Sequence, residues 1–280
     1  MEAVVRSGQA SRTAVAAARY RAEHQELDGA FLFQDPLARV ILGDVEEQAE
    51  FLSEDARRRM RLFIASRSRF AEDALADAVG SGTQQAIILG AGLDTFAYRN
   101  PHPDLRVFEV DHPDTQRWKR HRITAAGINI PRSVTYIPID FQRQSLRAAL
   151  TAADFDSHQP AFVIWLGVTV YLPRHTIIQT IHHLGGLAPG TQVVCDYATA
   201  TLQSAEAREM HDERRRRLAA IGEPWISFFT PEEVSALLRD NGLRVEEDLT
   251  GAQLIHCYLG RPAPTSTTGP HIVRACVLGR

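Results

Sequence analysis

The sequence is poor in cysteine and carries no excess of positive charge. Its three cysteines, Cys195, Cys257 and Cys276, are widely spaced and form no CxxC pair. Neither a disulfide framework nor a zinc site is indicated, and we expect no bound metal. The formal net charge of −3 gives no sign of the basic surface that nucleic-acid binding requires. We therefore expect no nucleic-acid partner.

Long apolar runs are also missing. No run approaches the roughly 18 apolar residues of a membrane span, and residues 1–15 (MEAVVRSGQASRTAV) lack the apolar core of a signal peptide. We therefore expect a cytoplasmic protein with no membrane partner. The chain does contain 280 residues with 44% apolar and 23% charged side chains, which is ordinary for a soluble globular protein and allows one large buried core.

One central stretch, QAIILGAGLDTFAYRNPHPDLRVFEVD, predicts the middle of the fold. A short apolar run is followed by the turn Gly90, Ala91, Gly92, then by a short helix and a second apolar run that ends in Glu109 and Asp111. Apolar runs bounded by glycines are typical of parallel strands buried on both faces. Glycines after a strand let a ligand approach the backbone, and an acid about 20 residues further on can hydrogen-bond a ribose. The stretch indicates the adenosine-binding half of a doubly wound α/β domain.

The choice of cofactor depends on Asp94 and Thr95. A dinucleotide-binding fingerprint needs a third glycine where this chain has Thr95. Asp94 would repel a pyrophosphate at close range, whereas S-adenosylmethionine (SAM) carries no phosphate. The pattern therefore favours SAM over NAD and makes a dehydrogenase the weakest interpretation. A purely structural tight turn is the alternative that the pattern alone leaves open.

Predicted strands and helices alternate along most of the chain, and the last two strands favour an antiparallel pair. A strand that ends in Asp140 and Phe141 suits an adenine edge and face, because ligands of open α/β sheets gather at the carboxyl ends of strands. Strands are expected over residues 86–89, 105–110, 134–139, 161–166, 192–197, 244–249 and 271–278. Helices are expected over residues 11–28, 36–42, 44–60, 61–79, 145–152, 171–187, 201–219 and 230–241, with a further helix capped near Asp114 or Thr115.

Two of the predicted helices are rich in cations. The first holds Arg12, Arg19, Arg21 and His24 beside Tyr20, so it is either a solvated surface helix or a cap that presents cations to an anion over an active site. The helix over residues 61–79 leads into the glycine turn and carries Arg67 and Arg69 in its middle. An arginine at that place could clamp a carboxylate.

These segments together resemble the leucine carboxyl methyltransferase family, a branch of the class I SAM-dependent methyltransferases that includes bacterial enzymes of natural-product tailoring. The matching motifs cover most of residues 11–200 in the order of the family. They are SRTA...A..YRA, FxDPLA at 33–38, SRSRFAED, LGAGLDTFAYR, VFEVDHP with Lys119 soon after, the IDF turn and WLGVTVYL.

The resemblance implies a doubly wound, seven-stranded, mostly parallel sheet with a C-terminal antiparallel strand pair. It implies a helical N-terminal cap over residues 1–60 and a SAM-binding core over residues 61–280. SAM would lie at the strand ends, with the glycine turn beside its methionine part. The implied cofactor-binding residues are Arg67 (or Arg69) at the SAM carboxylate, Gly90, Ala91, Gly92, Asp94, Asp111 at the ribose, its neighbour His112, Asp140 and Phe141 at adenine, and Leu166.

Leu166 departs from the pattern of the family. Members that methylate proteins carry an acid there, as a contact to the methionine amino group, whereas many bacterial relatives also carry leucine. Asp94 or the backbone carbonyl of Leu89 could take over this contact.

The resemblance, together with the arginines of the first helix, implies methyl transfer from SAM to a carboxylate of a small-molecule acceptor. A carboxylate is already ionised at neutral pH and needs no general base. Tyr20 and Arg21, with Arg19 and His24 nearby, are the candidates for holding the acceptor. One alternative is a phenol or hydroxyl acceptor, which needs a base such as His24 or His112. Another is a SAM-binding module without turnover.

Overall fold

The computed structural model describes residues 11–45, 53–140, 144–199, 224–264 and 269–279, with isolated positions between 209 and 219. Phe141 and most of the helix expected over residues 201–219 lie outside these ranges. The strands are β1 (Gln85–Leu89), β2 (Arg106–Asp111), β3 (Val134–Pro138), β4 (Phe162–Trp165), β5 (Gln192–Ala198), β6 (Leu243–Thr250) and β7 (Pro270–Val277). The helices are α1 (Arg12–Leu27), α2 (Leu37–Leu42), α3 (Glu54–Gly80), α4 (Phe96–Arg99), α5 (Pro113–Ala125), α6 (Leu146–Ala152), η1 (Thr169–Tyr171), α7 (Arg174–Gly185), α9 (Pro231–Asp240) and α10 (Gly251–Tyr258).

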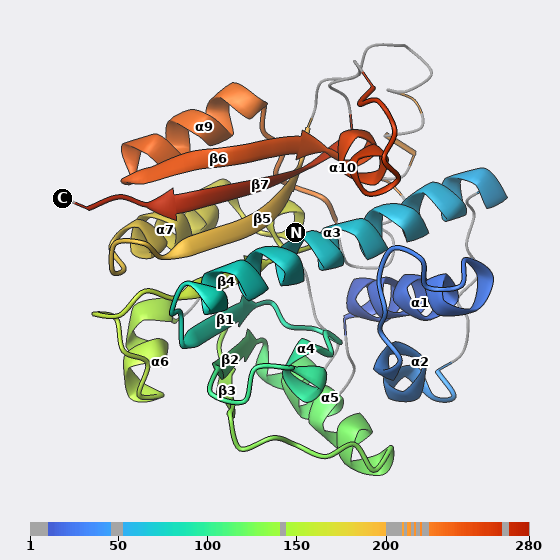
Figure 1. The fold of residues 1–280 in the computed structure, drawn as a ribbon, viewed down its shortest axis with the longest axis horizontal. Coiled ribbons are helices and arrows are strands. Elements are labelled where there is room, and N and C mark those ends of the chain that lie inside the picture. Colours follow the sequence, from blue (N-terminus) through green and yellow to red (C-terminus); the bar gives the residue numbers. More distant parts are fainter. Residues whose placement is uncertain are drawn as a thin grey trace.

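All the described strands form one seven-stranded sheet in the order β3-β2-β1-β4-β5-β7-β6 (Figure 1). β1 to β5 pair in parallel, while β7 is antiparallel to both β5 and β6. The strand order reverses between β1 and β4, and ligands of open α/β sheets bind at such a switch point. The expected doubly wound fold with a C-terminal antiparallel pair is confirmed.

The central strand β1 is buried on both faces, which explains its unbroken apolar sequence. Ile87 and Leu89 face one core together with residues of α6, α7 and α9. Ala86 and Ile88 face a second core together with residues of α3, α4 and α10. The two cores hold the sheet rigidly between helices, so the loops at its carboxyl edge are presented on a fixed frame.

The helices α1 and α2 and the first half of α3 pack together and are here called the cap. Figure 1 shows this half of α3 extending past the sheet beside α1 and α2, and α1 contacts both of the other helices. Ser11 caps α1 as expected, because its hydroxyl accepts from the N–H of Ala14. The division expected at residue 60 falls inside α3, which runs without a break from Glu54 to Gly80.

Two details of the expected helices were wrong. The cap residue of α5 is His112, whose side chain accepts from the N–H of Asp114, because Pro113 already occupies the first helical position. The helix α10 was not expected at all, although Thr250 and Gln253 form a capping box at its start. No described helix combines the length and the apolar character needed to cross a bilayer.

Candidate functional site

The glycine turn after β1 is packed between the loop after β4 and the cap. Gly90 has φ +65° and Gly92 has φ +46°, a region that side chains rarely adopt. A Cβ at Gly90 would lie 2.3 Å from Cγ2 of Val168, and a Cβ at Gly92 would lie 3.0 Å from Cβ of Ala14 in α1. The turn thus touches β4's loop on one side and the cap helix on the other.

Asp111 ends β2 beside this turn. One carboxylate oxygen accepts from the N–H of Gly92, and the other accepts from the N–H of His112 at 2.6 Å. Desolvation raises the pKa of Asp111, although the two N–H donors oppose the shift. A carboxylate oxygen accepts more than one hydrogen bond, so both can still receive ligand hydroxyls.

Glu109, the other acid at the end of β2, is used inside the protein. Its carboxylate accepts from Nζ of Lys119 at 2.8 and 2.9 Å, and both side chains are only 1% exposed. Tyr98 donates to the same carboxylate at 3.3 Å. The geometry therefore leaves Asp111 as the acid of β2 that is available at the sheet edge.

Arg67 points from α3 to the ends of β4 and β5. Its Nη1 donates to Asp196 of β5, and Nη2 would lie 3.0 Å from a Cβ at Gly167. The other oxygen of Asp196 accepts from the N–H of Gly167 at 2.6 Å. Arg69 instead lies on the outer side of α3, where it pairs with Asp73 and covers the ring of Tyr258. Arg67 is thus the arginine at the strand ends.

Three further residues that the sequence assigned to the cofactor, Leu166, Asp94 and Asp140, lie just after β4, β1 and β3. Leu166 is half-buried and packs against the core shared with α3, so it brings no charge to the strand end. Asp94 accepts from the N–H of Phe96 at 2.8 Å, which ties it to the start of α4. The N–H of Asp140, just after β3, donates to the side chain of Gln144 at 3.0 Å.

Arg21 belongs to a cluster of charged and polar side chains, here called the anchoring cluster, that ties the cap to the segment after the glycine turn. Arg21 donates to Asp35 at 2.8 Å and to the carbonyl of Leu93 at 2.6 Å. The hydroxyl of Thr95 donates to Asp35 at 2.6 Å, and Thr95 accepts from Arg99 at 3.0 Å. The cluster consists of Arg21, Asp35, Glu72, Thr95 and Arg99, with Arg99 paired to Glu72.

The anchoring cluster gives Thr95 a structural role at the position of the third glycine of a dinucleotide-binding fingerprint. The threonine hydroxyl holds a carboxylate of the cap that is fully buried. Burial by itself would raise the pKa of Asp35, but the charges of Arg21 and Arg99 and the hydrogen bond from Thr95 lower it overall. Residues from several separate sequence motifs therefore meet in one place.

Tyr20 and His24 are also buried in the cap. Tyr20 packs with Phe63 and Ile64 of α3. Nε2 of His24 accepts from the N–H of Leu32 at 3.2 Å, so Nδ1 carries the proton that is shared with Asp28 at 3.0 Å. Both ring nitrogens of His24 are thus engaged within the cap.

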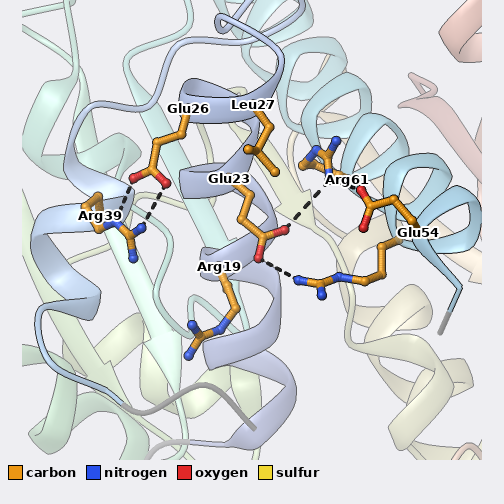
Figure 2. Close-up of a pocket in the computed structure, with 8 residues that line it drawn as sticks. Arg19, Glu23, Glu26, Leu27, Arg39, Glu54 and Arg61 are labelled. Carbon is orange, nitrogen blue, oxygen red and sulfur yellow. Dashed lines mark hydrogen bonds and ion pairs between the residues drawn. The ribbon is translucent and has the colours of Figure 1, made fainter. Parts of the chain in front are cut away.

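Arg19 lines a pocket of the cap instead of the sheet edge (Figure 2). Figure 2 shows Glu26 pointing toward Arg39, with which it pairs at 2.7 Å, whereas Arg19 points away from these acids and donates to the carbonyl of Val45 at 3.2 Å. The pocket contains none of the residues expected at the cofactor, so it is not the candidate site. Its lining consists of Arg19, Glu23, Glu26, Leu27, Arg39, Glu54, Arg57 and Arg61.

The candidate site is therefore the row of groups along the carboxyl edge of four adjacent strands. Asp111 ends β2, the glycine turn follows β1, Gly167 lies just after β4, and Asp196, paired with Arg67, lies near the end of β5. Asp196 was missed in the sequence. The only signal was an acid near the end of the predicted strand at 192–197, and local pattern gives no way to see its partner 129 positions away.

Comparison with known proteins gives concordant matches. The profile of the family described as leucine carboxyl methyltransferase matches residues 14–185. YktD of Bacillus subtilis (strain 168), provisionally named an S-adenosyl-L-methionine-dependent methyltransferase, is 31% identical over 275 residues, which cover 88% of this chain and 90% of YktD.

Solved structures match in fold. A DUF574 family protein from Streptomyces avermitilis MA-4680 has a TM-score of 0.61 at 13% identity and covers 96% of this chain and 98% of its own. Magnesium protoporphyrin IX methyltransferase from Synechocystis PCC 6803, crystallised with bound SAH, has a TM-score of 0.51 at 14% identity, with 92% and 97% covered.

Proposed function

The chain belongs to the leucine carboxyl methyltransferase family, and from this premise we propose that it methylates a carboxylate of a small-molecule acceptor of the secondary-metabolite class, with SAM as the methyl donor. The observation that carries the proposal is the row from Asp111 through the glycine turn to Arg67 at the switch point of the sheet. Asp111 suits the hydroxyls of a nucleoside, and Arg67 suits the carboxylate of an amino acid joined to it.

The residues at the strand ends fit SAM chemically. Asp111 offers two carboxylate oxygens for ribose hydroxyls, and the glycine turn lets a ligand approach the backbone. Nε of Arg67 is buried with no hydrogen-bond partner among the described residues, so this arginine retains capacity for a carboxylate. Asp140 and Phe141 are proposed at adenine, Asp140 from its place after β3 and Phe141 from the sequence alone.

SAM supplies, when bound, a methyl group on a positively charged sulfur. The work left to the protein is to hold the acceptor in line with that group and to keep water away. The helix α1 lies directly against the glycine turn through Ala14, and the anchoring cluster holds it there. We infer from this position that the cap covers the methyl group and excludes water.

The two histidines that could serve as a base are engaged in other hydrogen bonds, which favours a carboxylate acceptor. An ionised carboxylate attacks without losing a proton, whereas a phenol needs a base. His24 has both ring nitrogens engaged, and His112 uses its side chain to cap α5. Tyr20 and Arg21 lie inside the cap, so we assign them to its structure and leave the acceptor contacts unassigned.

The first experiment is calorimetric titration of the protein with SAM, with NAD as the control. We expect SAM to bind and NAD not to bind. Binding of NAD without SAM would contradict the proposed function and every cofactor contact assigned above.

The second experiment identifies the product. The protein is incubated with methyl-labelled SAM and separate panels of carboxylic acids and phenols, and the products are treated with mild alkali. A methyl ester releases labelled methanol, whereas a methyl ether does not. An alkali-stable product that disappears in His112→Ala would favour the hydroxyl alternative. SAM binding without transfer to any acceptor in either panel would favour the module without turnover.

A further inference from the structure

The pair of Arg67 and Asp196 adjoins the glycine turn through the loop after β4. In this loop Val168 contacts Gly90, and its neighbour Gly167 donates its N–H to Asp196 at 2.6 Å. Thr169 donates its hydroxyl to the backbone carbonyl of Asp196 at 2.7 Å. The loop therefore fixes the position of β5's acid relative to the turn that approaches the cofactor.

The pair has unused hydrogen-bonding capacity although it is nearly buried. The side chains of Arg67 and Asp196 are 11% and 8% exposed. Nε of Arg67 has no partner among the described residues. Each oxygen of Asp196 accepts one hydrogen bond from the described residues, whereas a carboxylate can accept about four in total. Desolvation offsets most of what a buried ion pair contributes to stability, so stability alone is a weak reason for this pair.

The opposite charges of the pair match an α-amino acid, which carries a carboxylate and an ammonium group on one carbon. Leu166, just after the neighbouring strand β4, offers no charge, and Asp94 forms no ion pair with Arg67 among the described residues. Asp196 is thus the acid that stands beside Arg67 at the strand ends.

We propose that Asp196 receives the ammonium group of the methionine part of SAM, while Arg67 binds the adjacent carboxylate. This inference rests on the proposed function, because it presumes that SAM is the ligand. It makes Asp196 a cofactor-binding residue and the Arg67–Asp196 pair a receptor for the zwitterion.

The test measures affinity in place of activity. The ligands are S-adenosylhomocysteine (SAH), its analogue without the amino group, and 5′-methylthioadenosine, which lacks the amino acid end. Each is titrated by calorimetry into the wild type, Asp196→Asn and Asp196→Glu. Asp248→Asn is the matched control, because Asp248 is also held by hydrogen bonds, from Tyr197 at 2.6 Å and with His271 at 2.8 Å.

The expected result is a selective loss. Asp196→Asn should weaken SAH about 10- to 100-fold, the usual effect of losing hydrogen bonds to a charged group, and should change the other two ligands less than about threefold. Asp196→Glu keeps the charge beside Arg67 but moves the carboxylate by one methylene, so it should also weaken SAH selectively. Asp248→Asn should leave the ratio of affinities unchanged.

Two outcomes would overturn the inference. An unchanged SAH affinity in both Asp196 variants would remove the residue from the site. An equal loss for all three ligands would show that the pair only maintains the structure. A wild type that binds none of the ligands would instead contradict the proposed function itself, so the two failures are distinguishable. If Asp196→Asn fails to fold, Asp196→Glu carries the same comparison.

Discussion

Gly90 illustrates how one residue meets two separate demands. It needs a positive φ, and it leaves no room for a side chain against Val168. Gly127 shares the first demand, with φ +66°, but a Cβ there would meet nothing within 4 Å. The two glycines therefore separate backbone strain from crowding.

We predict that Gly90→Ala lowers the free energy of unfolding more than Gly127→Ala does. Both lose about 1 kcal/mol to backbone strain, and only Gly90→Ala loses about a further 1–3 kcal/mol to overpacking. Denaturant titration measures the difference. Equal losses would show that the loop after β4 yields to the added methyl group.

A second prediction concerns Asp111. Asparagine has only one side-chain acceptor atom, so Asp111→Asn should lose the charge and one of the two backbone contacts, to Gly92 or to His112. SAH affinity measured by calorimetry should fall roughly 10- to 100-fold. Asp104→Asn is the control, because it makes the same change at an exposed turn before β2. An affinity loss shared by both variants would point to a general charge effect.

At the scale of elements, the anchoring cluster fixes α1 and α2 over the sheet edge. Asp35→Asn leaves Arg21 without its buried charge partner, although Arg99 keeps Glu72, and should cost about 3 kcal/mol of unfolding free energy. Glu26→Gln removes an ion pair with Arg39 that is largely exposed, since the side chain of Glu26 is 44% and that of Arg39 is 54% exposed. It should cost less than about 1 kcal/mol of unfolding free energy. Similar effects of the two substitutions would mean that the cap is not held by this cluster.

The ionisation of Asp35 should also make the stability of the protein depend on pH. The pKa of Asp35 lies below its ordinary value of 3.8, so the folded state favours the ionised form. Its stabilising effect is complete above about pH 4 and is lost as pH falls through the lower folded pKa. The difference in unfolding free energy between wild type and Asp35→Asn should thus shrink as the pH falls below about 4. A difference that persists undiminished in acid would rule out this charge as its source.

At the scale of the whole molecule, α3 joins the cap to the core. The division at residue 60 stays a prediction, and the continuity of α3 across it favours common unfolding. Trp118 packs against the cluster shared by α1 and α2, and Trp165 is buried in the core under α7. Variants that keep only one of these tryptophans should show coincident fluorescence transitions. SAH at 100 times its dissociation constant should raise the unfolding free energy of both single-tryptophan variants by about 2.7 kcal/mol. Separate transitions would establish the cap as an independent unit.

The fold and part of the site follow from local sequence, because they depend on neighbours along the chain. Apolar runs ended by glycines predicted the buried parallel strands, and Ser11 predicted the start of α1. Thr230 and Glu233 predicted α9 through their capping box. Asp111 and the glycine turn were assigned from spacing and resemblance, and the structure brings them into contact.

Other features were decided only by tertiary structure, because they join residues far apart in the chain. The helix pattern by itself does not show whether Arg67 or Arg69 faces the strand ends. In the folded chain Arg67 contacts Asp196, whereas Arg69 covers the ring of Tyr258. The cations of α1 suggested an acceptor site, yet Arg21 is held by Asp35, which no periodicity reveals. The sequence by itself determined the strands, the turn and the family of this protein. The pairing of charges across separate elements needed the folded chain, because a buried charge takes its role from the partner that neutralises it.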